Sequence, residues 1–84
     1  MTSFFVPYRQ SQIHYLQWGS GKEYLLCLHG FGESAASFAG LAEQLKEKYT
    51  IIALDMPLHG KTVWNEGLLC TITDIRDMIE KIPG

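Results

Sequence analysis

The chain has 84 residues, 46% of them hydrophobic, a composition that suits one small globular domain or part of one. Its 7 basic and 9 acidic residues are scattered and give a net charge of −2, so no surface for nucleic acid or anionic lipid is expected. No apolar run is long enough to span a membrane and the N-terminus lacks a signal segment, which predicts a cytoplasmic protein.

The first two predicted elements are strands that form an antiparallel hairpin. Phe4–Tyr8 and Ile13–Trp18 are rich in aromatic and β-branched residues and are separated by the polar stretch Arg9–Gln12. Pro7 has no backbone N–H to donate, which predicts that the first strand lies at the edge of a sheet.

Two further apolar runs, Tyr24–Leu28 and Thr50–Leu54, have the composition of parallel strands that are buried on both faces. Between them, apolar residues repeat at three- and four-residue steps and predict a helix that Ser34 or Ser37 caps. The repeating residues are Phe38, Leu41, Ala42, Leu45 and Tyr49. A strand, a helix and a strand within about thirty residues form a right-handed crossover with parallel strands.

A second helix is predicted near the C-terminus, where Thr71 is suited to cap it and Pro83-Gly84 to end it. Its apolar stripe consists of Ile72, Ile75, Ile79 and Ile82. The element order β-β-β-α-β-α predicts an α/β fold with a mixed, mostly parallel sheet and flanking helices.

Two turns follow the predicted parallel strands, at the sheet edge where ligand sites form in such folds. The first is His29-Gly30-Phe31-Gly32-Glu33-Ser34, in which two glycines allow the backbone to approach a ligand closely. The second runs from Asp55 to Thr62 and contains Pro57 and the pair His59-Gly60. These turns are the candidate site.

Over residues 13 to 82 the chain resembles the α/β-hydrolase superfamily, in which a hydrophobic strand, His-Gly-x, a helix, a strand and Asp-x-Pro-Gly-His-Gly-x-Ser follow one another. Leu58 stands where the family usually has Gly, and Thr62 where it usually has Ser, so the bend after the second parallel strand is expected to differ. The resemblance implies that chain 1–84 is the N-terminal part of one such domain and ends before the strand that carries the nucleophile.

The resemblance also implies a role for the first turn. In the family, the N–H of the residue after His-Gly is one half of the oxyanion hole, which here is Phe31. Phe31 and Gly32 are then expected to contact substrate, whereas Gly30 and Gly60 shape the turns. The implied activity is ester or related acyl-bond hydrolysis by a Ser-His-acid triad beyond residue 84, so that the 84 residues alone are inactive. A small acyl-lyase of the same fold is an alternative.

The histidines and Asp55 of the turns are expected to be structural. We expect His29 to bond a loop carbonyl, Asp55 to accept from backbone donors of its own turn, and His59 to brace that turn. An Asp55–His59 dyad is the alternative. No metal-ligand spacing or cofactor motif is present, so neither a metal nor a cofactor is predicted.

Other reactive residue types also have structural interpretations. Gly32-Glu33-Ser34 is close to a nucleophile elbow, but Ser34 lies six positions after Leu28, so helix capping is favoured. Cys27 and Cys70 have no adjacent basic residue and are expected to be unreactive thiols. Trp64 is expected to cover an apolar patch.

A small-molecule substrate is the expected partner. The rival hypothesis is a non-catalytic binding module of the same fold. In the family, a further strand lies beside Tyr24–Leu28, so here one edge of this strand and part of the isoleucine stripe are expected to be exposed. The chain is then expected to self-associate or to be only marginally stable. Epoxide hydrolases and haloalkane dehalogenases are disfavoured, because Phe31 and Gly32 differ from their usual residues.

Overall fold

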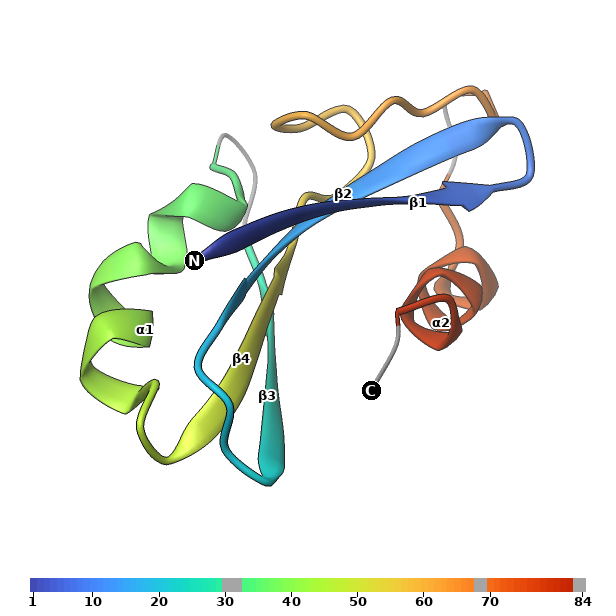
Figure 1. The fold of residues 1–84 in the computed structure, drawn as a ribbon. Helices are drawn as coiled ribbons and strands as arrows, with labels where there is room; N and C mark the ends of the chain where they lie inside the picture. The colour runs from blue at the N-terminus through green and yellow to red at the C-terminus, as the bar shows by residue number, and fades with distance from the viewer. Residues whose placement is uncertain (30–32, 68–69, 83–84) are drawn as a thin grey trace.

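Four strands form one mixed sheet, with a helix on each side (Figure 1). The computed structural model describes residues 1–29, 33–67 and 70–82. The elements are β1 (Thr2–Tyr8), β2 (Ser11–Trp18), β3 (Glu23–Leu28), the 3₁₀ turn η1 (Ala35–Phe38), α1 (Ala39–Leu45), β4 (Tyr49–Leu54) and α2 (Ile72–Glu80). This order confirms the predicted α/β fold.

The sheet order is β1-β2-β4-β3, with β1 and β2 antiparallel, β2 and β4 antiparallel, and β3 and β4 parallel. The predicted hairpin and parallel crossover are therefore confirmed, and Pro7 lies in an edge strand as expected. The connection after β4 returns along β2, where Gln12 and Val63 exchange two backbone hydrogen bonds of 2.8 Å.

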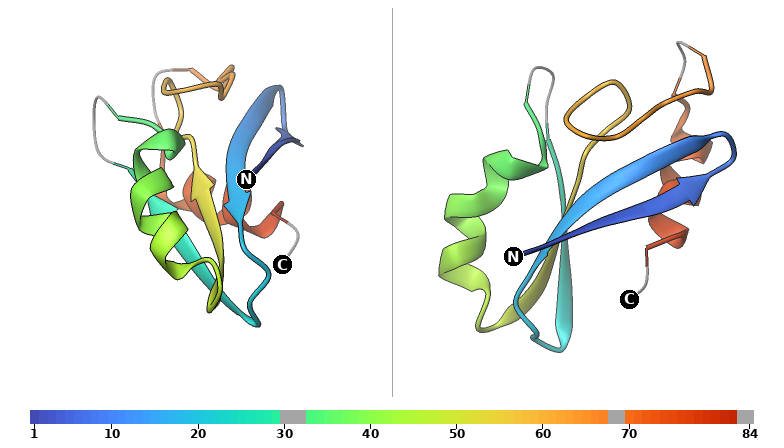
Figure 2. Two further views of the ribbon diagram at one scale, coloured as in Figure 1. Left: turned by 60° about the vertical axis from the view of Figure 1, so that its left-hand side comes forward. Right: turned by 45° about the horizontal axis from the view of Figure 1, so that its top comes forward.

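Strand β4 lies in the interior and divides its side chains between two hydrophobic clusters. Ile51 and Ala53 face the cluster under α1, whereas Ile52 and Leu54 face the cluster under α2. This alternation follows from the two-residue period of a strand. Figure 2 shows α1 and α2 on opposite sides of the sheet, so β4 is covered on both faces as predicted.

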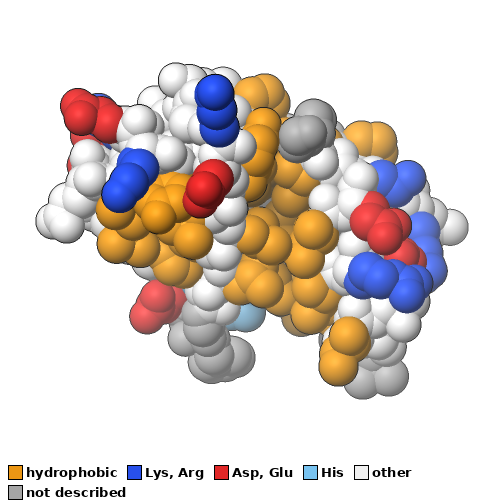
Figure 3. All heavy atoms as spheres, turned by 90° about the horizontal axis from the view of Figure 1, so that it is seen from below, with side chains coloured by type: hydrophobic (Ala, Val, Ile, Leu, Met, Phe, Trp, Pro, Cys, Tyr) orange, Lys and Arg blue, Asp and Glu red, His pale blue; other side chains and the backbone are white. Residues whose placement is uncertain are grey.

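Strand β3 differs from its prediction. Leu25 and Cys27 pack on the α1 side, but Tyr24, Leu26 and Leu28 are exposed. The reason is that β3 has β4 as its one sheet partner among the described residues, and α2 packs over the other end of the sheet. Figure 3 shows hydrophobic side chains gathered across this underside of the molecule.

The helices also depart from their predicted stripes. Tyr49 begins β4, and Leu41 is 46% exposed, so the helix before β4 is shorter than predicted and buries mainly Ala42. In α2, Thr71 caps the helix as predicted, accepting from Asp74 N–H. Met78 lies at the centre of the buried face, however, and Ile72 is 86% exposed. Part of the isoleucine stripe is thus exposed, as expected.

Candidate functional site

The carboxylate of Asp55, directly after β4, holds together three segments of the chain. Its Oδ1 accepts from the N–H of Ala35 at 2.7 Å, and its Oδ2 accepts from the N–H of Lys61 at 2.9 Å. The carbonyl of Asp55 also accepts from the Thr62 hydroxyl at 2.7 Å. The prediction that Asp55 accepts backbone donors of its own turn is confirmed, and the bond from Ala35 extends it to the segment that begins η1.

An imidazole that the sequence analysis did not select completes this arrangement. His14, on β2, lies with Nδ1 at 2.6 Å from Asp55 Oδ2, and both side chains are 4% exposed. Burial would raise the pKa of Asp55, but the bonds from Ala35, Lys61 and His14 outweigh it and leave the pKa of this carboxyl below its ordinary value. The partner of Asp55 is therefore His14, not the His59 of the alternative dyad.

A signal for His14 was present in the sequence. It stands alone in an apolar strand, on the face that carries Leu16 and Trp18, and a buried imidazole needs a polar partner. His14 is joined to the turn by its backbone as well, since its N–H donates to Thr62 Oγ1 at 2.9 Å and its carbonyl accepts from Asp55 N–H.

His29 and His59 contact the turn after β4. Nε2 of His29 accepts a hydrogen bond from the N–H of Met56 at 2.9 Å. The partner in this bond is a backbone N–H, whereas a loop carbonyl was predicted. His59 Nδ1 lies 2.9 Å from the carbonyl of Pro57, a contact within the turn that His59 was expected to brace. The two rings pack edge to face with centroids 4.9 Å apart.

The bend itself depends on two residues with left-handed backbone. Gly60 has φ +55°, and a Cβ there would lie 2.2 Å from the Asp55 carboxyl carbon, so glycine is required for the carboxylate to sit where it does. Leu58 has φ +69°. The position at which the family usually has Gly therefore keeps a conformation that favours Gly, although a leucine occupies it.

Phe31, Gly30 and Gly32, the predicted oxyanion-hole turn, lie outside the described residues, and their roles remain predictions. Close to that turn in sequence, Ser34 is the N-cap residue of η1, as expected: its carbonyl accepts from Ser37 N–H at 3.0 Å. A cavity of about 260 Å³ is lined by Met1, His14, Leu16, Ser34, Ala36, Asp55, Gly60 and Lys61. It adjoins the Asp55 arrangement.

The remaining reactive groups fit structural roles. Cys27 is buried, which raises the pKa of its thiol, whereas Cys70 is exposed and the pKa of its thiol is raised by partial desolvation and by the charge of Asp74. Trp64 is buried against Tyr8, with ring centroids 5.9 Å apart, so it covers an apolar area as expected. Within residues 1–29, 33–67 and 70–82, no group of three His, Cys, Asp or Glu side chains is placed to hold a metal ion.

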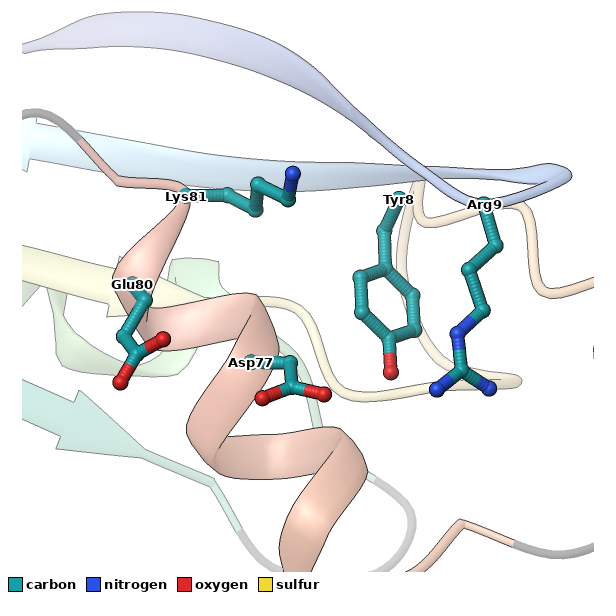
Figure 4. A pocket seen from close by; sticks show the side chains of 5 residues that line it. All are labelled: Tyr8, Arg9, Asp77, Glu80 and Lys81. Atoms are coloured by element: carbon teal, nitrogen blue, oxygen red, sulfur yellow. The ribbon is translucent and has the colours of Figure 1, made fainter.

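A second cleft, of about 430 Å³, lies between the β1–β2 turn and α2 (Figure 4). Tyr8 and Arg9 face Asp77 and Glu80 across it. Burial and the hydrogen bond to Asp74, 2.8 Å long, raise the pKa of Tyr8 to about 12. Asp74 also lies 3.6 Å from Arg9, so these groups tie α2 to the hairpin.

Among the described helices, none is long and apolar enough to cross a membrane.

Comparison with known proteins identifies relatives over most of the chain. Residues 23–82 match the model of the alpha/beta hydrolase fold family. The chain is 36% identical to the uncharacterized hydrolase YugF of Bacillus subtilis, over 70% of this chain and 22% of that protein. It is 35% identical to human epoxide hydrolase 4, over 84% of this chain and 21% of that protein. The chain thus spans about a fifth of the length of these curated relatives.

Solved structures agree with these matches. The thioesterase domain from the curacin biosynthetic pathway superposes with a TM-score of 0.85 at 27% identity, covering 99% of this chain and 33% of that one. E-2-(acetamidomethylene)succinate hydrolase gives a TM-score of 0.79 at 28% identity, covering 95% of this chain and 29% of that one. The family model matches more than half of the chain, and the chain therefore belongs to the α/β-hydrolase family.

Proposed function

We propose that the whole protein hydrolyses an ester or related acyl bond by a Ser-His-acid mechanism, with its triad encoded beyond residue 84. In this proposal Phe31 N–H is one of the two oxyanion donors, and Phe31 and Gly32 contact the substrate. The observation that carries the proposal is that β3 and β4, which the two turns follow in sequence, pair in parallel, and that the bond from Ala35 to Asp55 joins the segments beyond them.

The arrangement supports this chemistry because an oxyanion donor must be fixed before reaction. Asp55 holds the start of η1 through Ala35 and the turn after β4 through Lys61, so one buried carboxylate joins the segment that follows the first turn to the second turn. A donor that is already in position needs no reorganisation free energy when charge develops on the substrate oxygen.

The test uses the protein encoded by the whole open reading frame, which should contain Gly-x-Ser-x-Gly after residue 84. Phe31→Pro removes the proposed donor, whereas Phe31→Ala keeps it. With nitrophenyl esters, the proline variant should lose about 100-fold or more in kcat, and the alanine variant should lose much less. Equal losses in both variants would contradict the role of the N–H. Absence of a nucleophile motif would favour the binding module.

A second candidate is hydrolysis of an epoxide, which the 35% identity with human epoxide hydrolase 4 favours. Phe31 and Gly32 disfavour this activity, because they differ from the residues that epoxide hydrolases usually have there. Assay of the whole protein with a styrene-type epoxide beside a nitrophenyl ester separates the two candidates: turnover of the epoxide alone would replace the esterase proposal.

We further propose that the 84-residue chain associates with a second copy along β3. The support is the exposure of Tyr24, Leu26 and Leu28 on a strand with one described sheet partner. Size-exclusion chromatography with light scattering should give a mass above that of one chain, and Leu26→Lys should shift it towards the monomer. A monomer at all concentrations would refute the association.

A further inference from the structure

Three polar side chains from three segments form a continuous line of hydrogen bonds beside β2. Ser3, on β1, has its Oγ 2.5 Å from Nε2 of His14. His14 in turn has its Nδ1 2.6 Å from Oδ2 of Asp55. Register brings them together, because Ser3 pairs with Leu16 and Phe5 with His14 across the hairpin, which places Ser3 and His14 on one face.

The direction of the protons along this line follows from the carboxylate. Asp55 accepts backbone N–H bonds at both oxygens and its pKa is lowered, so it is ionised and can only accept from the imidazole. Nδ1 of His14 therefore carries the proton. In the neutral ring, Nε2 is then an acceptor directed at the Ser3 hydroxyl, which donates to it. These are the relations of nucleophile, base and acid in a serine hydrolase.

The surroundings leave the hydroxyl accessible and provide space beside the base. Ser3 is exposed, whereas His14 is 3% exposed. The His14 ring lines the cavity of about 260 Å³, whose wall also includes the apolar side chains of Met1, Leu16 and Ala36. Ser3 is not among the residues that line this cavity, so the cavity provides space beside the base.

We propose that Ser3 is a nucleophile, with His14 as its general base and Asp55 as the orienting acid, and that activated esters acylate it. Ser3 Oγ attacks the ester carbonyl carbon while its proton passes to His14 Nε2. The bond from that carbon to the leaving oxygen breaks, the leaving group departs as an alkoxide or phenolate, and His14 returns the proton to it or to water. The product is one acyl ester on Ser3 per chain. This site is distinct from the triad proposed beyond residue 84, and it replaces the expectation that the 84 residues alone do not react with esters.

The 84-residue chain itself is the test material, with nitrophenyl butyrate as the probe. The expected result is a burst of one nitrophenolate per chain and one butyryl group on Ser3, located by fragmentation of the tryptic peptide that ends at Arg9. Ser3→Ala should abolish the burst. In a His14→Gln chain that circular dichroism shows to be folded, the burst should be slowed by about 100-fold, the usual contribution of a general base.

Matched controls separate the site from ordinary surface reactivity. Thr2→Ala removes the neighbouring hydroxyl, and Ser20→Ala removes an exposed hydroxyl that does not line the cavity, so both variants should keep the burst. Circular dichroism establishes that Ser3→Ala folds. The proposal is overturned if the label is found on the amino terminus or on lysines and not on Ser3, or if a folded Ser3→Ala chain shows the same burst.

Discussion

Asp55 and Asp74 are both buried carboxylates that join segments far apart in the sequence, but their surroundings differ. Asp55 has a side chain that is 4% exposed, and its partners are a buried imidazole and two backbone N–H groups. Asp74 is 11% exposed in its side chain and bonds Tyr8, the N–H of Thr71 and the largely exposed Arg9. Both have a pKa below the ordinary aspartate value, Asp74 chiefly through the bond from Thr71.

The stability that each carboxylate contributes depends on whether the donors that it bonds could bond water in its absence. Without Asp74, the N–H of Thr71 at the exposed start of α2 and the exposed Arg9 can bond water instead, and among the donors left over only the Tyr8 hydroxyl is buried. Without Asp55, an imidazole and the N–H of Ala35 would remain in the interior without their acceptor. Asp55 is thus the more costly residue to lose.

The largest effect is expected from Asp55→Ala. Removing one partner of a buried pair costs about 3–5 kcal/mol, so this variant should be largely unfolded. Asp74→Ala should fold, with a clearly smaller loss in the free energy of unfolding. Urea titration followed by tryptophan fluorescence measures both. Equal losses would mean that burial does not distinguish the two carboxylates.

Gly60→Ala should come next, because it disturbs Asp55 without touching the carboxylate chemically. The added Cβ would lie 2.2 Å from the carboxyl carbon, and the residue has φ +55°. We expect a loss of about 2 kcal/mol, in the range of strained backbone positions. Gly40→Ala is the control, since nothing lies within 4 Å of a Cβ there and alanine favours a helix. A neutral Gly60→Ala would show that the carboxylate can move.

Acid should destabilise the chain through both carboxylates. Both carboxyls have a lower pKa in the folded chain than the ordinary value of 3.8, so their ionised forms stabilise the fold at pH values above 3.8. This stabilisation is lost as the pH falls below 3.8 and through the folded-state pKa. The melting temperature should therefore fall steeply below about pH 4. Asp74→Asn should flatten this limb only in part, because Asp55 still titrates. A complete loss of acid sensitivity in that variant would assign the whole effect to Asp74.

The smallest effect is expected from Leu58→Gly. Leu58 has φ +69° and is 66% exposed, so glycine relieves strain with little loss of buried area. The gain is partly offset by the greater freedom of glycine in the unfolded chain, which leaves up to about 1 kcal/mol of stabilisation. Thermal unfolding measures it. A destabilised variant would mean that the Leu58 side chain contributes contacts that outweigh the backbone strain.

The sequence predicted the parts of this fold that depend on local pattern. The hairpin, the parallel pair, the Thr71 cap and the Ser34 cap follow from periodicity and capping chemistry. The role of Asp55 within its own turn was also predictable, because an aspartate at the start of a turn commonly accepts from nearby N–H groups.

What could not be predicted depends on partners distant in the sequence. His14 lies 41 residues from Asp55, and no local pattern relates them. The exposure of Ile72 and the central position of Met78 depend on where α2 meets the sheet, which helical periodicity leaves open. Likewise the composition of Tyr24–Leu28 predicted a strand buried on both faces. Whether a face is buried depends on the strands and helices that pack beside it, and these are not encoded in the strand itself.

The bond between Ala35 and Asp55 has a consequence for the order of folding. Asp55 reaches its final position only when β4 has paired with β2, because its N–H donates to the carbonyl of His14. The Ala35 amide proton is therefore shielded from solvent only after the hairpin, β4 and the segment before η1 have all assembled. Ala35 and Asp55 are only 20 residues apart in sequence, and contacts at such a separation usually form earlier in folding. Its exchange with deuterium should require opening of the whole sheet, whereas amides at the start of α2 exchange through local fraying.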